Sequence, residues 1–389
     1  MLQATWIAGL LMCGMGVAVL GSIKMALARR LDLNEARVGG LVSVFGFAMI
    51  PVMLIMGFLT DMLNKQFVVV AGSLLMVASL VILSRARKYW AALLAVVLLS
   101  AGWSGLVNVL NVLMGAAFGG EPTYHMNLGN FFFGLGAFLT PLLVAAILNR
   151  AGFVPATLVL AAVTLLPGLL ALGVDFAALV EPTTTQAVTT QAAEAPGIGI
   201  LLTDPIMWLT ALALLFYAPM EATMGAWTTT YLGDKGVSET RASAMLSGFW
   251  LAFMVSRLFT ALVVSPHLQT GSATSILIIV LALLCVVAWT GTVASRNRGM
   301  ACAMVIFAGL IFGPTFPTII GVLVGHVDPA VGGRAVGLFF MIGGVGWSII
   351  PIMIGAYARR ASVQKAFLIA VAAAVGLTLT AIALRPFMT

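Results

Sequence analysis

Twelve apolar stretches, each long enough to cross a lipid bilayer, divide this sequence at short polar breaks. A bilayer core about 30 Å thick requires about 20 apolar residues in a helix, and a helix satisfies its backbone hydrogen bonds internally. Only 8% of the residues are charged, against roughly 25% in soluble domains. The sequence therefore predicts an all-α, multi-pass membrane protein with twelve transmembrane helices. The stretches fall near residues 5–28, 38–60, 67–84, 91–114, 127–149, 154–175, 205–231, 241–263, 273–294, 299–325, 334–357 and 366–387.

One break is longer and differs in composition. Residues 181–196, EPTTTQAVTTQAAEAP, are rich in Thr, Gln, Ala and Pro and contain no aromatic residue. This composition is typical of a flexible linker. We therefore expect a six-helix bundle in residues 1–175, a linker in 176–203 and a second six-helix bundle in 204–389.

The two predicted bundles also share sequence patterns. Asn34-Glu35-Ala36-Arg37 aligns with Ser238-Glu239-Thr240-Arg241 at an offset of 204, and Gly134-x-Gly136-x-x-x-x-Pro141 aligns with Gly344-x-Gly346-x-x-x-x-Pro351 at an offset of 210. Six helices per repeat is an even number, so the bundles should be parallel repeats related by an axis along the membrane normal. Asn34 and Ser238 are predicted helix caps. The glycines should allow close helix packing, and the prolines should bend their helices.

A loop after the second stretch carries a recognisable motif. Gly57-Phe58-Leu59-Thr60-Asp61-Met62-Leu63-Asn64-Lys65 resembles the G-x-L-x-D-R-x-G-R-K signature of the major facilitator superfamily. Gly57, Leu59, Asp61 and Lys65 fit that signature, whereas Met62 and Asn64 depart from it. The resemblance implies two pseudo-symmetric bundles, alternating access, and a conformational latch that includes Gly57, Asp61 and Lys65. We assign Arg257, near the end of the eighth stretch, to a latch as well.

Three further segments are similar to the fucose permease branch of that family, which imports sugars. They are His125 to Ala137, Phe216 to Leu232 and Gly313 to Thr318. Fucose–proton symporters of this branch carry an Asp in helix one and a Glu in helix four. The comparable stretches here, 20–24 and 103–108, contain no acid, which argues against proton coupling through the first bundle.

Glu221 is the strongest candidate for a functional side chain. An ionisable residue within a membrane helix costs on the order of 2.5–3.5 kcal/mol, so such residues are functional candidates by default. Glu221 could bind a proton or sodium ion, or accept hydrogen bonds from substrate; a structural hydrogen bond is the alternative. Lys24 either extends to the lipid headgroups or serves ion coupling as a cavity cation that pairs with Glu221 or attracts an anionic substrate.

Neutral polar and aromatic side chains complete the candidate substrate site. The amides of Asn108, Asn111 and Asn130 suit sugar hydroxyls, although they could equally join helices. Trp227, Tyr231, Trp250 and Trp347 could stack on a sugar ring, or anchor helices at the membrane interface. We expect Phe316-Pro317 to break the tenth helix beside the cavity.

Other function classes lack support in the sequence. Nucleotide-binding loops, metal clusters and paired nucleophiles are absent, so we expect neither an enzyme nor a cofactor. Cys13, Cys285 and Cys302 lie in apolar stretches as packing residues. The net charge of +7 comes from basic residues spread along short loops, which favours contact with membrane lipid over nucleic acid.

Membrane orientation is where the residue pattern and the resemblance disagree. The family topology places both termini in the cytoplasm, where basic residues should gather. Of the loop residues, Lys65, Arg334 and Arg385 fall on that side and fourteen fall on the other. We retain the family orientation as the expectation, on the strength of the 57–65 motif.

The sequence thus predicts a secondary transporter of the inner membrane, acting as a monomer on a small polar solute such as a sugar, with proton or sodium as the coupled ion. An exporter of amphipathic drugs or lipids is an alternative, favoured by the 21 methionines. A non-transporting membrane receptor or scaffold is a second alternative, although it would be expected to carry a long soluble domain.

Overall fold

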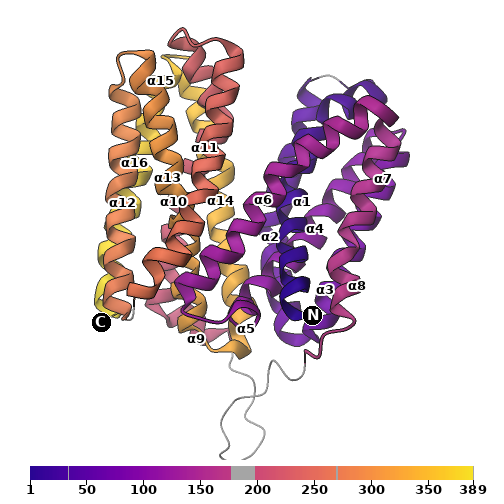
Figure 1. Ribbon diagram of the computed structural model, residues 1–389, viewed down its shortest axis with the longest axis horizontal. Coiled ribbons are helices and arrows are strands. Elements are labelled where there is room, and N and C mark those ends of the chain that lie inside the picture. Colours follow the sequence, from indigo (N-terminus) through magenta and orange to yellow (C-terminus); the bar gives the residue numbers. More distant parts are fainter. Residues whose placement is uncertain (34, 177–197, 269, 389) are drawn as a thin grey trace, which may run out of the picture.

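Two bundles of long helices make up the protein (Figure 1). The structure is a computed structural model that describes every residue except 34, 177–197, 269 and 389; the side chains of 35, 36, 38, 39 and 42 are also not described. The first bundle contains α1 (Leu2–Leu31), α2 (Glu35–Met62), α3 (Lys65–Arg85), α4 (Tyr89–Val112), α5 (Met114–Phe118), α6 (Pro122–Ala151), α7 (Phe153–Thr164) and α8 (Leu166–Ala171).

The second bundle repeats this architecture. Its helices are α9 (Gly199–Thr203), α10 (Pro205–Asp234), α11 (Glu239–Phe259), α12 (Gly271–Ala294), α13 (Arg298–His326), α14 (Gly332–Ala358), α15 (Val363–Ala366) and α16 (Leu368–Leu384). A π-helical turn, Thr260–Val264, and a 3₁₀ turn, Ser265–His267, extend α11, and 3₁₀ turns also flank α14 and α16. Within the described residues, twelve segments are long and apolar enough to span a membrane, which confirms the predicted number.

Glycines of the sequence repeat make equivalent contacts within the two bundles. A Cβ atom added at Gly136 of α6 would lie 2.0 Å from the backbone oxygen of Leu11 in α1. At Gly346 of α14 it would lie 2.1 Å from the backbone oxygen of Leu215 in α10. Leu11 and Leu215 differ by 204 residues, the offset found for the first sequence match. The repeat therefore places the same backbone contact in both halves.

The partner glycines of the same motif face the opposite bundle. A Cβ atom at Gly134 would lie 2.9 Å from the Met254 side chain of α11, and one at Gly344 would lie 3.2 Å from the Ile50 side chain of α2. Ile50 and Met254 are again 204 residues apart. Each Gly-x-Gly motif thus joins its helix to its own bundle through one glycine and to the other bundle through the second.

Two local predictions require correction. Ser238 occupies the N-cap position of α11 but makes no side-chain cap hydrogen bond, and Asn34 lies outside the described residues. Phe316-Pro317 does not break its helix, because α13 continues through both Pro314 and Pro317. The Thr318 hydroxyl donates to the Pro314 carbonyl over 2.7 Å, which is the type of side-chain compensation that lets a membrane helix accommodate proline.

The bundles approach each other at the end of the molecule that carries both termini, and they diverge toward the opposite end (Figure 1). Close packing of α2 on α14 holds the first end together. A Cβ atom at Gly337 would lie 2.6 Å from the Met53 carbonyl oxygen, and one at Gly57 would lie 2.5 Å from the Gly333 carbonyl oxygen. The backbones meet directly here, so the polar groups of residues 57–61 lie against the start of α14.

Candidate functional site

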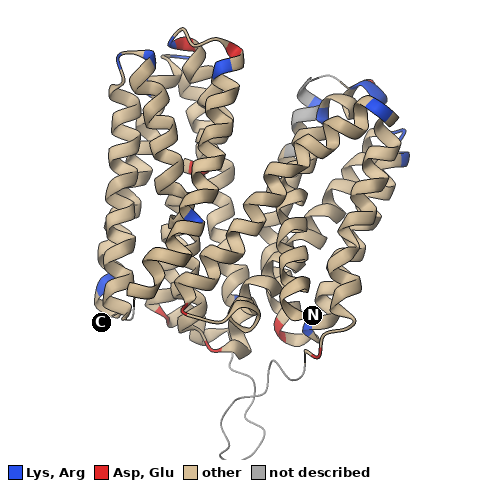
Figure 2. Cartoon of the chain, viewed as in Figure 1, with Lys and Arg blue, Asp and Glu red and all other residues tan. Residues whose placement is uncertain are grey.

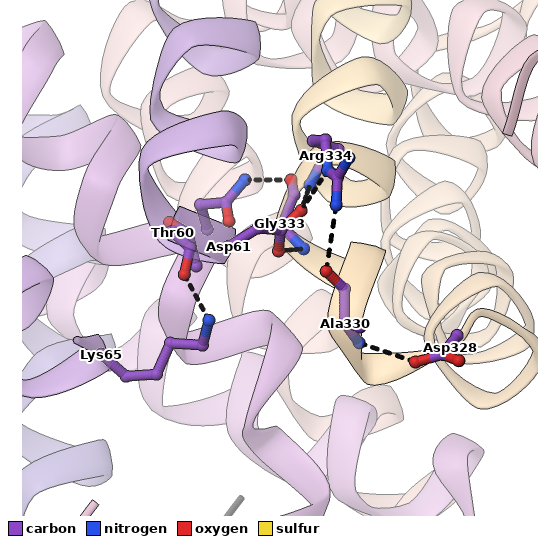
Figure 3. Close-up of polar contacts among 8 residues, drawn as sticks. Thr60, Asp61, Lys65, Asp328, Ala330, Gly333 and Arg334 are labelled. Atoms are coloured by element: carbon purple, nitrogen blue, oxygen red, sulfur yellow. Dashed lines mark hydrogen bonds and ion pairs between the residues drawn. The ribbon is translucent and has the colours of Figure 1, made fainter. Parts of the chain in front are cut away.

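A carboxylate of the first bundle caps a helix of the second. The Asp61 carboxylate accepts hydrogen bonds from the backbone N–H groups of Gly333 (2.6 Å) and Arg334 (3.0 Å) and from Arg334 Nε (2.8 Å; Figure 3). These N–H groups are at the start of α14, where the N-cap residue Val331 supplies no side-chain cap. The first N–H groups of a helix have no partner within it, and negative charge is stabilised there. Asp61 therefore acts as the missing cap across the boundary between bundles.

The Asp61–Arg334 ion pair is largely shielded from solvent. The side chains of Arg334 and Asp61 are 12% and 3% exposed. Asn108 of α4 extends the same group of contacts, because its amide nitrogen donates to the Gly333 carbonyl over 2.9 Å. Lys65 donates to the Thr60 carbonyl within the first bundle. We refer to Asp61, Asn108, Gly333 and Arg334 as the latch.

Glycine is required on both sides of the latch. At Gly333 an added Cβ atom would lie 2.5 Å from both Asp61 Oδ1 and the Gly57 carbonyl oxygen. Real Cβ atoms essentially never approach so closely, and the neighbours at this position are backbone and a fully engaged carboxylate. The predicted latch residues Gly57 and Asp61 are therefore brought together by the fold, and Lys65 lies beside them.

A second polar group lies deeper in the molecule, around Glu221 of α10. The Tyr217 hydroxyl, one helical turn earlier, lies 3.0 Å from Glu221 Oε2 and 2.6 Å from the Phe312 carbonyl oxygen of α13. A tyrosine hydroxyl carries one hydrogen, and a carbonyl can only accept it. When Tyr217 donates to Phe312, the contact to Glu221 is a hydrogen bond only if the Glu221 carboxyl group carries a proton and donates it.

Arg257 of α11 is buried next to this group, with only 3% of its surface exposed. Its Nε donates to the Gly313 carbonyl over 2.8 Å, and its Nη1 donates to the Asn130 carbonyl of α6 over 2.9 Å. The Gly313 carbonyl lies four residues before Pro317, which has no N–H to donate back. Arg257 thus supplies the hydrogen bond that the proline removes, and its guanidinium also lies 4.1 Å from the centre of the Phe253 ring.

Arg257 links the bundles at a different place from the latch. Its contact with Asn130 joins the second bundle to the first, and among the described residues it forms no hydrogen bond with the predicted latch residue Asp61. Glu221 interacts electrostatically with Arg257, although among the described residues the two form no direct ion pair within 4.0 Å. The structure therefore groups Arg257 with Glu221, Tyr217 and Asn130.

The remaining predicted asparagines are engaged within the protein. Asn130 Nδ2 donates to the Met126 carbonyl over 2.9 Å, and Asn111 Nδ2 donates to the Val107 carbonyl over 2.7 Å. The Oδ1 atoms of Asn108 and Asn111 are buried without a hydrogen-bond partner. Of these amides, that of Asn108 donates to Gly333 of α14 and so joins two helices, whereas that of Asn111 donates within its own helix.

The predicted aromatic residues are dispersed, and several pack against other aromatic rings. Tyr231 is fully buried and donates to the Thr292 carbonyl over 2.8 Å. Trp250 packs edge-on against Phe249 and Phe253, and Phe316 contacts Phe339 and Phe340. Trp227 packs near Gly355, and Trp347 lies half-buried against the apolar core.

Lys24 is exposed on α1 and forms no ion pair with Glu221 among the described residues. Two cavities also lie outside the predicted substrate site. One, of about 400 Å³, is open to the surface and is lined by parts of α1, α6 and α7. Another, of about 260 Å³, lies between the starts of α6, α10 and α12 and the end of α13. Neither is lined by a residue of the Glu221 group.

Comparison with known proteins decides the family. A model of the major facilitator superfamily matches residues 5–351. The chain belongs to the major facilitator superfamily. It is therefore a secondary transporter rather than an enzyme, and the predicted two-bundle fold is confirmed.

Solved structures of other transporters share this fold. The structure of FucP in the outward conformation matches with a TM-score of 0.79 at 16% identity, covering 99% of this chain and 98% of that one. A second FucP structure, that of the E. coli fucose:proton symporter, matches with a TM-score of 0.76 at 15% identity and covers 98% of each chain. The human organic anion transporter MFSD10 matches with a TM-score of 0.75 at 16% identity, covering 98% of each chain.

A yeast relative, Bypass of stop codon protein 6 of Saccharomyces cerevisiae, is 25% identical over 175 residues. The match covers 43% of this chain and 35% of that protein. The chain thus aligns with only about a third of the length of this relative.

Sequence reasoning missed three members of these groups. Tyr217 precedes Glu221 by four residues, a spacing that places both on one helix face and could have indicated the pair. Arg334 is one of only three loop cations on its side of the chain, which could have marked it as a partner for Asp61. Gly333 had no such signal, because its role depends on the approach of α2.

Proposed function

We propose that this transporter couples the movement of a small polar solute to a proton that binds Glu221. The position of the Tyr217 hydroxyl between the Phe312 carbonyl oxygen (2.6 Å) and Glu221 Oε2 (3.0 Å) carries the proposal. The three groups form a continuous chain only when Glu221 is protonated. Loss of that proton leaves two acceptors competing for one tyrosine hydrogen, so the local structure responds to the protonation state of Glu221.

The charge of Arg257 adds a second reason for coupling. Arg257 is buried, and it donates hydrogen bonds to the neutral carbonyls of Gly313 and Asn130. An ionised Glu221 balances its charge, whereas a protonated Glu221 leaves the group with a net positive charge. Removing one charge from a buried group of opposite charges is costly, so proton binding and release change the electrostatics at the boundary between bundles.

We propose a sugar or similar polyol as the solute. The resemblance to the fucose permease branch supports this choice, as does the fold shared with FucP. Asn130, at the Arg257 contact, carries the kind of neutral amide that suits hydroxyl groups. The bundle limits of 1–175 and 204–389, the inner-membrane location and the roles of the predicted substrate-site residues belong to the same proposal.

One observation favours a second candidate, a small organic anion. Arg257 has no direct carboxylate partner in the described part of the chain, and protonation of Glu221 would leave its charge free to attract an anion. The solved structure of MFSD10, described as an organic anion transporter, has the same fold. The two candidates predict different dependence on substrate charge.

Uptake into proteoliposomes tests both. Radiolabelled fucose, xylose and glucuronate are supplied with and without an inward proton gradient. We expect the gradient to stimulate uptake of one of them by the wild-type protein, and Glu221→Gln to abolish that stimulation. Glutamine has the size of protonated glutamate, so exchange of labelled for unlabelled solute should persist. Equal gradient stimulation in both proteins would exclude Glu221 as the proton site.

A further inference from the structure

Exposed positive charge gathers at the end of the molecule where the two bundles diverge (Figure 2). We call this the basic end, and we call the end that carries both termini the terminal end. In the sequence, the turns and helix ends at the basic end carry fourteen cations and four acids, an excess of ten positive charges. All of these cations except Lys235 are exposed. The cations are Arg29, Arg30, Arg37, Arg85, Arg87, Lys88, Arg150, Lys235, Arg241, Arg296, Arg298, Arg359, Arg360 and Lys365, and the acids are Asp32, Glu35, Asp234 and Glu239.

The relation between loop charge and membrane orientation does not account for this excess. In the orientation expected for the family, both termini lie in the cytoplasm, so the basic end faces away from the cytoplasm. Basic residues normally gather in the cytoplasmic loops of a membrane protein. The cations of the basic end therefore require another explanation, and the attraction of an anion is the one that fits their chemistry.

The cavity of about 400 Å³ lies at the basic end. Its lining includes Ser22, Ala26 and Arg29 of α1 and Pro141, Leu148 and Asn149 of α6. Arg29 and Asn149 belong to the last turns of their helices. Of the described residues that line the cavity, Arg29 is the only charged one. Within the described part of the chain, the side chains of Arg29 and Asn149 make no hydrogen bond or ion pair, so both are available to a ligand.

The cavity faces the space between the bundles. At Gly134, α6 contacts the opposite bundle, because an added Cβ atom would lie 2.9 Å from the Met254 side chain of α11. Pro141 and Leu148 follow Gly134 by seven and fourteen residues, and seven residues make about two turns of a helix. The three residues therefore share a face of α6. Because the bundles diverge toward the basic end (Figure 1), this face borders the opening between them at the level of the cavity.

Ala226 of α10 faces the same opening from the second bundle. Its neighbour Gly225 lies against Trp250 of α11. Its other neighbour, Trp227, lies against Gly355 of α14. Ala226 is exposed, and its direction falls between these two contact sides of the helix. Helices α11 and α14 are the ones through which the second bundle meets α6 and α2 of the first. A solute that enters the opening therefore passes between Ala226 and the cavity.

We propose that the basic end is an entrance for organic anions, and that Arg29 and Asn149 form an outer site for the carboxylate of the entering solute. A guanidinium offers paired N–H groups that match the two oxygens of a carboxylate, and an amide can bond to a neighbouring hydroxyl group. The surrounding cations raise the rate of capture, because electrostatic steering increases association rates by about 10- to 1,000-fold. A sugar acid such as glucuronate carries both a carboxylate and hydroxyl groups. The inference rests on the second candidate of the proposed function, an organic anion, and is independent of Glu221.

Charged thiol reagents measure the electrostatic potential in the opening without any solute. Cys13 and Cys285 are buried, and Cys302 is half-buried, so a background carrying Cys302→Ser removes the accessible thiol. Ala226→Cys is added to this background, and the protein is purified in a neutral detergent. Its rate of reaction with an anionic methanethiosulfonate is divided by its rate with a cationic one, after each rate has been divided by that of the same reagent with free mercaptoethanol. We expect this ratio to be about ten at about 20 mM ionic strength and about two at about 300 mM. A ratio of one or less at the lower ionic strength would overturn the proposal.

Two matched variants test whether the cations beside the opening are responsible. The first replaces four cations at the ends of α1, α6, α11 and α14 by Gln: Arg29, Arg150, Arg241 and Arg359. We expect the ratio at low ionic strength to fall about five-fold. The control replaces four cations at the α3–α4 and α12–α13 turns by Gln: Arg85, Arg87, Arg296 and Arg298. Because α3 packs on α4 and α7, and α12 on α13 and α16, these turns belong to the outer sides of the bundles, and the ratio should fall less than about two-fold. Equal losses in the two variants would refute the opening as the source of the potential.

Protection by a solute tests the outer site. Ala26 lines the cavity and is half-buried. Ala26→Cys, in the same background, is labelled by an uncharged maleimide with glucuronate or glucose present, while sodium chloride keeps the ionic strength constant. A site with a Kd of about 5 mM is two-thirds occupied at about 10 mM glucuronate, which should slow labelling about three-fold. Glucose should give no protection. Arg29→Gln should remove the protection by glucuronate, whereas Arg85→Gln should retain it.

The outcomes separate this proposal from the proposed function. Absence of protection by glucuronate, or equal protection in Arg29→Gln, would overturn the outer site. Stronger protection by dispersed phosphatidylglycerol than by glucuronate would overturn it as well, because the cations would then serve lipid headgroups. Gradient-stimulated uptake that depends on Glu221 would stand in each of these cases, since it does not require Arg29.

Discussion

Asp61→Asn is expected to open the terminal end of the molecule. The carboxylate accepts three N–H groups from α14, at 2.6, 3.0 and 2.8 Å, with 3% of its side chain exposed. Asparagine keeps one acceptor oxygen but replaces the other by an NH₂ group, which faces the two donors of Arg334. Two charge-assisted hydrogen bonds are therefore lost.

The size of the effect follows from what those bonds contribute. A hydrogen bond to a charged group contributes about 1.5–3 kcal/mol, and loss of a helix cap costs about 0.5–2 kcal/mol. Water replaces part of this hydrogen bonding once the bundles separate. The substitution should therefore lower the free energy of separating α2 from α14 by about 2–4 kcal/mol. At about 1.4 kcal/mol per factor of ten, the population in which α2 has left α14 should rise about 30- to 700-fold.

Spin labels on either side of the latch provide the assay. Met62 is 78% exposed at the end of α2, and Ala330 is exposed just before α14. Cysteines at these positions, in a Cys302→Ser background, carry the labels. Pulsed electron–electron double resonance measures the distribution of distances between them. A longer-distance population should appear in Asp61→Asn.

Asp328→Asn is the matched control. It removes the same charge at the same end, but within the described part of the chain the Asp328 side chain accepts only from Ala330 N (2.8 Å), in its own bundle. Its distance distribution should match that of the parent. If Asp61→Asn also left the distribution unchanged, the reasoning that Asp61 stabilises the closed latch would be refuted.

Two further substitutions test the neighbouring contacts. Gly333→Ala places a Cβ atom 2.5 Å from Asp61 Oδ1, and such overpacking typically costs about 1–3 kcal/mol. The melting temperature in detergent should therefore fall, and the long-distance population should rise. The control Gly233→Ala, with no atom within 4 Å of the added carbon, should change neither quantity. Tyr217→Phe removes a hydrogen bond worth about 1 kcal/mol at Glu221. The proton concentration that gives half-maximal uptake should therefore rise about five-fold. A shift no larger than that of the control Tyr357→Phe, at an exposed position, would exclude Tyr217 as a partner of the proton site.

Helix positions were accessible from the sequence because membrane thickness imposes a length on each apolar stretch. The main error came at the start of α6, predicted at 127 and observed at Pro122. The residues in between, including Thr123 and His125, look like loop by polarity. In the structure both are buried. Thr123 lies where the start of α6 meets Gly321 of α13, and His125 packs on Gly115 and bonds to the Gly119 and Gly120 carbonyls of its own bundle.

The sequence indicated that Asp61 is functional, but it did not indicate which groups Asp61 contacts. The 57–65 motif identified the acid, but its ligands are two backbone N–H groups and one side chain more than 270 residues away. Similarly, Pro317 was predicted to break its helix. The sequence does not reveal that Arg257 Nε donates to the Gly313 carbonyl, which Pro317 leaves without a backbone partner. Both cases depend on which helix backbone becomes available when the two bundles meet.

The two polar links between the bundles differ in what opening would cost. The latch lies at the end of the molecule, where water can replace the bonds of Asp61 once α2 and α14 separate. Arg257 is 3% exposed, in the last turn of α11, and separation removes its bond to the Asn130 carbonyl of α6. Under the proposed function, an ionised Glu221 on the same bundle compensates that loss through its attraction to the guanidinium, whereas a protonated Glu221 does not. Proton release from Glu221 should therefore favour separation of α6 from α11, which ties the occupancy of the proton site to the position of the bundles.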